Sequence, residues 1–211
     1  MADLDPGLTA VLVVAAFFLV WYYGAFVYTR RLARRIGTEL KRAVVVLGGT
    51  SKIQWFGPGA FRMKTEGANP PFQEFSLTVT LRPREMPINW AIGTAQDRRD
   101  AALVEASLRK DPRIEFELVD PKTRIGRRRS RSKADWSKVS LGGGELLLSS
   151  DDERGARRIL ESIDPSALDP IAALHVTAGK QPGIAASVSV APGAAARGIE
   201  AIRALAERLT A

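Results

Sequence analysis

The most extended feature of the hydropathy pattern is the segment 6–29, which contains no charged side chain. As an α-helix rising about 1.5 Å per residue it would span roughly 36 Å, enough to cross a hydrocarbon core of about 30 Å with some tilt. Trp21, Tyr22 and Tyr23 follow its aliphatic centre, and such side chains favour the headgroup boundary. The pattern predicts a transmembrane helix; a cleaved signal peptide would instead begin with basic residues, whereas this start carries Asp3 and Asp5.

Basic side chains gather on one side of this segment. Between positions 30 and 42 they are Arg30, Arg31, Arg34, Arg35, Lys41 and Arg42, against the single acid Glu39. The positive-inside rule places this side in the cytoplasm. We therefore expect a single-pass protein of the cell membrane, with a short N-terminus outside and the C-terminal domain in the cytoplasm. Arg30, Arg31, Arg34 and Arg35, with Trp21, Tyr22 and Tyr23, are expected at the membrane surface.

Apolar residues then recur every fourth position, at Leu32, Ile36, Leu40 and Val44. This spacing predicts a basic amphipathic juxtamembrane helix within 30–49 that continues to about Leu47 and ends at the following glycines. Its apolar stripe could lie on lipid headgroups or pack on the domain.

The middle of the chain alternates between apolar and polar residues, as half-buried strands do. Runs at 52–56 and 60–65 flank a Gly-Pro-Gly turn and predict a hairpin, and 74–81 is the clearest strand. Further strands are expected at 88–92, 102–108, 113–119, 138–141, 145–149, 173–177 and 184–190. Within 113–119 we expect Phe116 and Leu118 to point inward and Glu117 outward. One polar face and short turns favour antiparallel pairing.

Helical patterns follow most of the strands. Ser150 and the acids after it predict a helix start, 165–174 is expected to add a helical turn, and 194–209 is amphipathic. Strands first and helices later indicate an α+β fold, here a mainly antiparallel sheet with two or three C-terminal helices. The predicted organisation is N-terminus and transmembrane helix at 1–29, juxtamembrane helix at 30–49, and cytosolic α+β domain at 50–211.

The charge of the chain is concentrated locally. Among 211 residues, 31 Lys and Arg face 23 Asp and Glu, a formal net charge of +8. Residues 122–136 are rich in bases and lack a hydrophobic rhythm, so we expect an exposed basic loop. Candidate ligands of an anionic partner are Arg124, Arg127, Arg128, Arg129, Arg131 and Lys133. The identity of the partner remains open: it could be lipid headgroups, nucleic-acid phosphates or an acidic protein, or the loop could have no partner. A surface for single-stranded nucleic acid would need more aromatic residues than Trp136.

The amino-acid composition excludes several classes of catalytic and metal site. Without cysteine there is no disulfide, thiolate zinc site or thiol nucleophile, and with one histidine no multi-histidine metal site can form within one chain. The glycines at 48–49 lack the spacing of a phosphate-binding loop. Asp151 and Asp152 fit helix capping, and His175 fits a structural role in a strand. No catalytic residue, cofactor or metal site is predicted.

The order of elements supplies one further comparison. The chain begins with an N-terminal anchor, followed by a β-rich middle with the sequence Leu-Arg-Pro-Arg at 81–84. A helix that starts at Ser-Ser-Asp-Asp, 149–152, and a final amphipathic helix come after it. This layout resembles a loose group of uncharacterised prokaryotic single-pass proteins with a cytosolic α+β domain. The resemblance implies no activity. Our hypothesis is a membrane-tethered interaction module with a protein partner at the membrane; an electrostatic binder of lipid or nucleic acid, and an enzyme whose site is not visible in sequence, are alternatives.

Overall fold

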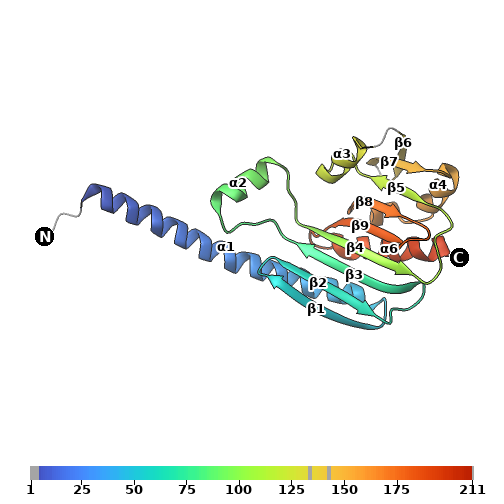
Figure 1. Cartoon of the computed structure of the whole chain (residues 1–211), viewed down its shortest axis with the longest axis horizontal. Coiled ribbons are helices and arrows are strands. Elements are labelled where there is room, and N and C mark those ends of the chain that lie inside the picture. Colours follow the sequence, from blue (N-terminus) through green and yellow to red (C-terminus); the bar gives the residue numbers. More distant parts are fainter. Residues whose placement is uncertain (1–4, 133–134, 142–143, 211) are drawn as a thin grey trace.

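A single long helix, α1 (Pro6–Val45), begins the structure, a computed structural model that describes residues 5–132, 135–141 and 144–210. Asp5 caps the helix by accepting a hydrogen bond from the Gly7 amide, and Pro6 occupies the first turn, where its missing N–H costs nothing. The N-terminal half projects alone from the body (Figure 1), and none of its apolar window is buried. The helix is long and apolar enough to cross a membrane, a property that anchors share with signal sequences.

The C-terminal half of α1 belongs to the core of the domain. Its buried side chains include Ala33, Ile36, Leu40 and Val44. The apolar stripe of this helix therefore packs on the domain and does not lie on lipid headgroups. The helix stops before Gly49, whose φ of +75° is open mainly to glycine. A Cβ at this position would also overlap the Glu66 carbonyl, so the chain can turn here into the first strand only with glycine.

Within the described residues nine strands form one sheet, in which every pairing is antiparallel. The strands are β1 (Thr50–Gly57), β2 (Ala60–Glu66), β3 (Phe72–Thr80), β4 (Ala101–Leu108), β5 (Phe116–Val119), β6 (Ser137–Leu141), β7 (Gly144–Ser150), β8 (Ile171–Val176) and β9 (Ile184–Ser189). Their order across the sheet is β1-β2-β3-β4-β9-β8-β5-β7-β6. The last hairpin, β8–β9, therefore inserts between β4 and β5 and makes the two halves one sheet.

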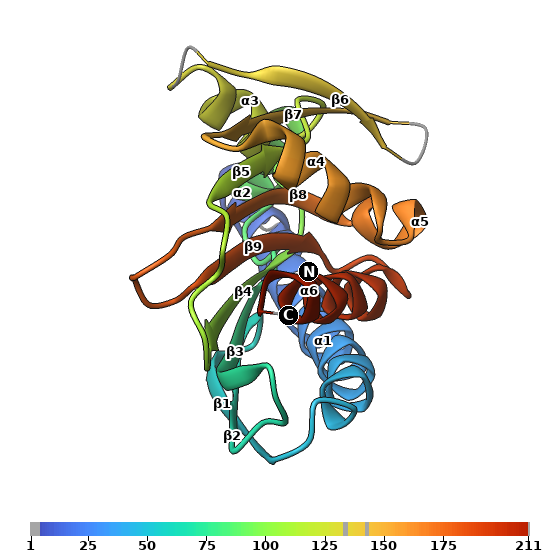
Figure 2. The ribbon, with the colours of Figure 1, turned by 90° about the vertical axis from the view of Figure 1, so that its right-hand side faces the viewer.

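Helices cover one face of this sheet. Figure 2 shows α4 (Glu153–Glu161), α5 (Pro165–Leu168), α6 (Ala194–Thr210) and the C-terminal half of α1 on the same side. Buried side chains between the layers include Phe61, Phe75, Leu160 and Ile202. The predicted α+β class, with an N-terminal apolar helix, an antiparallel sheet and C-terminal helices, is confirmed.

Two predicted elements are wrong. The expected strand at 88–92 is the helix α2 (Pro87–Ala95), which Pro87 starts by fixing a helical φ in the first turn. The expected loop at 122–136 contains the helix α3 (Arg124–Ser130), because Thr123 caps it by accepting from the Gly126 amide. The sequence signal for this helix was the Thr123 hydroxyl, a helix cap, followed by arginines, which are good helix formers. Lys133 and most of the expected turn at 142–144 lie outside the described residues.

The predicted strand at 113–119 is also shorter than expected, and its outer face is covered. Only Phe116–Val119 are in β5, and all four of these residues are buried, Glu117 included. Glu117 points to the outer face, where it pairs with Arg129, but α3 lies over that face, so both faces of β5 are covered. Most other strands and helices lie within a few residues of their predicted bounds.

Candidate functional site

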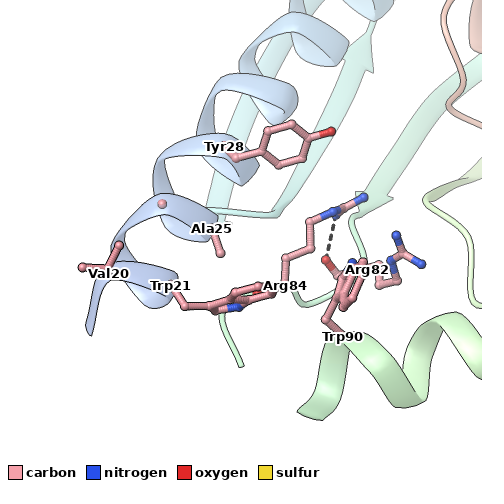
Figure 3. A pocket seen from close by; sticks show the side chains of 8 residues that line it. Val20, Trp21, Ala25, Tyr28, Arg82, Arg84 and Trp90 are labelled. Carbon is pink, nitrogen blue, oxygen red and sulfur yellow. Dashed lines mark hydrogen bonds between the residues drawn. The ribbon is translucent and has the colours of Figure 1, made fainter. Parts of the chain in front are cut away.

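A cleft of about 550 Å³ lies where α1 leaves the body and passes α2; we call it the anchor cleft (Figure 3). Its walls are aromatic and basic side chains from three segments: Trp21 and Tyr28 on α1, Arg82 and Arg84 after β3, and Trp90 on α2. Trp21 is one of the residues expected at the membrane surface. Arg82, Arg84 and Trp90 were not expected in a site, although an uncharged stretch with a tryptophan between pairs of arginines was a signal for them.

Several contacts fix the geometry of the anchor cleft. The Trp21 Nε1–H donates to the Arg84 carbonyl at 3.0 Å, and the Trp21 and Trp90 ring centres are 5.8 Å apart. The Arg84 guanidinium lies 5.7 Å from the centre of the Tyr28 ring and forms a 2.6 Å ion pair with Asp100. Figure 3 also shows its hydrogen bond to the Arg82 carbonyl. These contacts join α2 to α1 through side chains, with the Arg84 guanidinium beside the Tyr28 ring.

A second concavity lies on the face of the sheet that the C-terminal helices leave uncovered; we call it the trough. It measures about 370 Å³ and crosses β3, β4, β9 and β8 beside α3. Its lining includes Thr78, Leu103, Ile125, Arg129, His175 and Ser187. Leu103 is 46% exposed and Ile125 is 39% exposed, whereas the residues around them are small or polar. The trough therefore offers two exposed large apolar side chains on a floor that consists mainly of alanines and polar residues.

A third concavity, of about 510 Å³, adjoins the trough at Thr80, Ala101, Ile125 and Ser187. We call it the arginine–aspartate cleft. Its charged lining includes Arg82, Arg124, Arg197, Asp100, Asp120 and Asp169. Among all residues that the structure describes, no group of three or more acids or histidines is arranged to hold a metal ion. If the protein is an enzyme whose site is not visible in sequence, the acids and arginines of this cleft are the candidates for that site.

One buried polar pair lies at the end of the trough. The Glu117 carboxylate, 7% exposed, accepts from the Arg129 guanidinium at 2.7 Å, and His175 is the neighbour of Glu117 across the β5–β8 ladder. The His175 Nδ1 atom is buried and has no hydrogen-bond partner within the described part of the chain. The histidine lies in strand β8, as predicted.

The predicted basic residues fall into two groups. Arg129 binds Glu117, and Arg127 donates to the Lys122 carbonyl and lies 3.8 Å from Asp97, so these two side chains stabilise α3. Arg124, Arg128 and Arg131 are exposed and form no ion pair with any described residue. The structure thus leaves three arginines available to an anion where the sequence suggested a uniform cluster.

The predicted membrane-surface residues all lie on α1. Tyr22 and Tyr23 are exposed, whereas Trp21 is half-buried against α2. The four arginines Arg30, Arg31, Arg34 and Arg35 are exposed on the side of α1 opposite to the buried Ala33 and Ile36. They therefore line the outward side of α1 where it joins the domain.

Two surface groups have shifted pKa values. The pKa of Glu153 is lowered because Arg157 and Ser137 hydrogen-bond its carboxylate, and the pKa of Lys138 is raised by its hydrogen bond and ion pair with Glu145. Both groups lie at the β6–α4 side of the domain. Their shifts reflect local pairing outside the three concavities.

Comparison of the chain with models of known protein families finds no match, and comparison with curated proteins finds no similar sequence. The site is therefore interpreted from its own geometry.

Proposed function

We propose that this protein is a single-pass membrane-anchored module of the cell membrane whose cytosolic α+β domain binds a protein partner. The anchoring is supported by the contrast between the two halves of α1. The N-terminal half contains an apolar window of which no part is buried in the domain, and the C-terminal half, which carries four exposed arginines, is part of the core. The charge asymmetry supports a cytosolic position for the domain.

The trough is the single observation that carries the proposed partner binding. A sheet packed by helices on one side usually exposes polar side chains on the other, whereas here Leu103 of β4 and Ile125 of α3 are exposed within a concavity on that side. Apolar residues surrounded by a polar rim are typical of protein interaction sites. Arg129 forms part of that rim and α3 carries further exposed arginines, which favours a partner with acidic groups around an apolar contact.

Crosslinking in intact membranes tests this proposal. The wild type and two variants, Leu103→Glu in the trough and Val45→Glu as a control on an exposed valine outside it, are captured after crosslinking and analysed by mass spectrometry. We expect the wild type and Val45→Glu to recover the same partner, and Leu103→Glu to recover several-fold less of it. Recovery of the bait alone, or an unchanged partner with Leu103→Glu, would contradict partner binding at the trough.

A second candidate function rests on the three arginines that form no ion pair with described residues. As an electrostatic binder, the protein would use Arg124, Arg128 and Arg131 to contact anionic lipid or nucleic acid. Replacing these three by serine should then weaken binding to phosphatidylserine vesicles or to duplex DNA and reduce its salt dependence. Arg129 is left intact because it pairs with Glu117.

The matched control removes three exposed arginines from the helical side of the domain. These are Arg154, Arg158 and Arg208. Equal losses in both triple variants would show that only the net charge matters, and unchanged binding in the α3 variant would reject the electrostatic function. Binding to DNA but not to vesicles would assign the basic surface to nucleic acid.

A further inference from the structure

Helix α2 exposes an unusual amount of apolar surface for an element of a water-facing domain. No charged residue occurs between Met86 and Gln96. Met86 is 47% exposed, Ile88 62% and Ile92 47%, and Gly93 is the one residue of the helix that is buried. Ile88 and Ile92 are four residues apart, so they lie on one face of the helix. A short helix with this surface calls for an apolar environment outside the domain.

The contacts between α2 and α1 show which part of α1 lies beside the apolar surface of α2. Its Trp90 packs on Trp21, the first aromatic residue after the aliphatic centre of the proposed membrane span. The preceding loop is held to the same level, because the Arg84 carbonyl accepts from the Trp21 indole and its guanidinium lies over Tyr28. Figure 1 shows α2 beside α1, displaced from the sheet toward the N-terminal end. The helix therefore lies level with the span residues expected at the headgroups.

Charged residues flank α2 as they flank membrane-surface helices. Arg82 and Arg84 precede it, and Arg98 and Arg99 follow it, whereas the helix itself is uncharged. Arg84 is paired with Asp100 and Arg99 with Asp97, whereas the Arg98 side chain is exposed without an ion pair to a described residue. Apolar side chains of α2 can then point into lipid while the exposed guanidinium group stays at the level of the phosphates.

The β1–β2 turn provides an independent indication of where the domain meets the lipid. A Cβ on Gly59 would come within 3.0 Å of the Thr29 methyl group, so this turn abuts the end of the charge-free segment. Trp55 and Phe56, which lead into the turn, are 47% and 58% exposed. Two separate parts of the domain thus present exposed apolar residues around residues 21–29 of α1.

We propose that α2 lies in the headgroup–acyl boundary of the bilayer that α1 crosses, with Met86, Ile88 and Ile92 in the lipid and Trp90 beside Trp21 at the boundary. This inference rests on the proposed anchoring by α1. Immersion of α2 gives the domain a second contact with the membrane, about which it cannot rotate freely. The trough and the basic surface of α3 are thereby held at a set orientation to the lipid.

The absence of cysteine allows a direct test on the full chain, because each added cysteine is a unique labelling site. Four single variants are labelled with an environment-sensitive fluorophore and reconstituted into phosphatidylcholine–phosphatidylglycerol vesicles with nitroxide-bearing lipids. Ile88→Cys and Ile92→Cys probe α2, and Leu12→Cys probes the span. Lys180→Cys, exposed in the β8–β9 turn at the end of the sheet away from α2, is the aqueous control.

We expect quenching at Ile88 and Ile92 by shallow nitroxides to exceed quenching at Lys180 several-fold, and Leu12 to be quenched best by deep ones. Quenching at Leu12 with none at Ile88 and Ile92 would overturn the inference and leave the anchor intact. No quenching at Leu12 would refute the anchor itself. Loss of lipid quenching at Ile88 together with crosslinking between two copies at that position would assign the α2 face to a second chain, which also overturns the proposal.

Discussion

The pair Arg129–Glu117 shows how much a single residue changes the interpretation of the basic segment. By sequence, Arg129 is one of seven bases between 122 and 133, and Glu117 is an outward-facing strand residue. In the structure the carboxylate is buried and the guanidinium satisfies it from α3. Spacing alone could not reveal this pair, because it depends on a short helix folding back over β5. The anion-binding hypothesis consequently rests on the exposed arginines.

Removal of Arg129 therefore tests a structural role. We expect Arg129→Ala to lower the free energy of unfolding by about 1–2 kcal/mol, less than for a fully buried pair because the guanidinium is half exposed. Arg128→Ala, on the same helix but without an ion pair to a described residue, should cost less than about 0.5 kcal/mol. Chemical denaturation in detergent measures both. Equal effects would show that Arg129 does not stabilise the buried carboxylate.

At the scale of elements, segments with a strong hydrophobic periodicity were predicted correctly as helix or strand, and a segment with a weak periodicity was not. The four-residue spacing of Leu32, Ile36, Leu40 and Val44 correctly predicted the helix, and strict alternation correctly predicted β3. The segment at 88–92 misled because a short apolar run fits strand and helix alike, and the deciding proline lies before it. The surface on which the juxtamembrane helix packs could not be predicted, since its apolar stripe suits lipid and protein equally.

The packed half of α1 should be essential to the stability of the domain. Leu40 is 1% exposed in the core, so Leu40→Ala is expected to reduce the free energy of unfolding by about 2–5 kcal/mol through lost burial and the cavity left behind. Lys41→Ala, one position away and exposed, is the control and should change it little. The measurement follows the near-ultraviolet circular dichroism of the domain during denaturation. A stable domain in Leu40→Ala would mean that the helix contributes nothing to its core.

At the scale of the molecule, the fold class could be predicted from the sequence and the candidate site could not. The α+β class needs only the order of strand and helix patterns, which the chain displays clearly. The trough brings together Thr78, Leu103, Ile125 and Ser187, and the anchor cleft joins Trp21 to Trp90. Such contacts depend on strand order and on the path of the loops, neither of which is encoded in local spacing.

The topology of the whole chain gives a third prediction. Under the proposed topology, protease added to sealed cells should leave the domain intact, because the positive-inside rule assigns the side with the arginines at 30–35 to the cytoplasm. The same protease should digest it in inverted membrane vesicles, with detergent-opened vesicles as the control for cleavability. Digestion in sealed cells would reverse the proposed orientation, and recovery of the full chain in the water-soluble fraction would remove the anchor.

The unbroken helical path of α1 limits where this protein can meet another. Its 40 residues extend roughly 60 Å without a linker, and the final turns are built into the core. If its first half crosses the bilayer, the domain has no tether on which to search the cytosol, in contrast to modules joined by flexible segments. Encounters are then confined to molecules diffusing within the membrane plane or arriving at its surface, and a partner must present its own contact at one fixed height above the lipid.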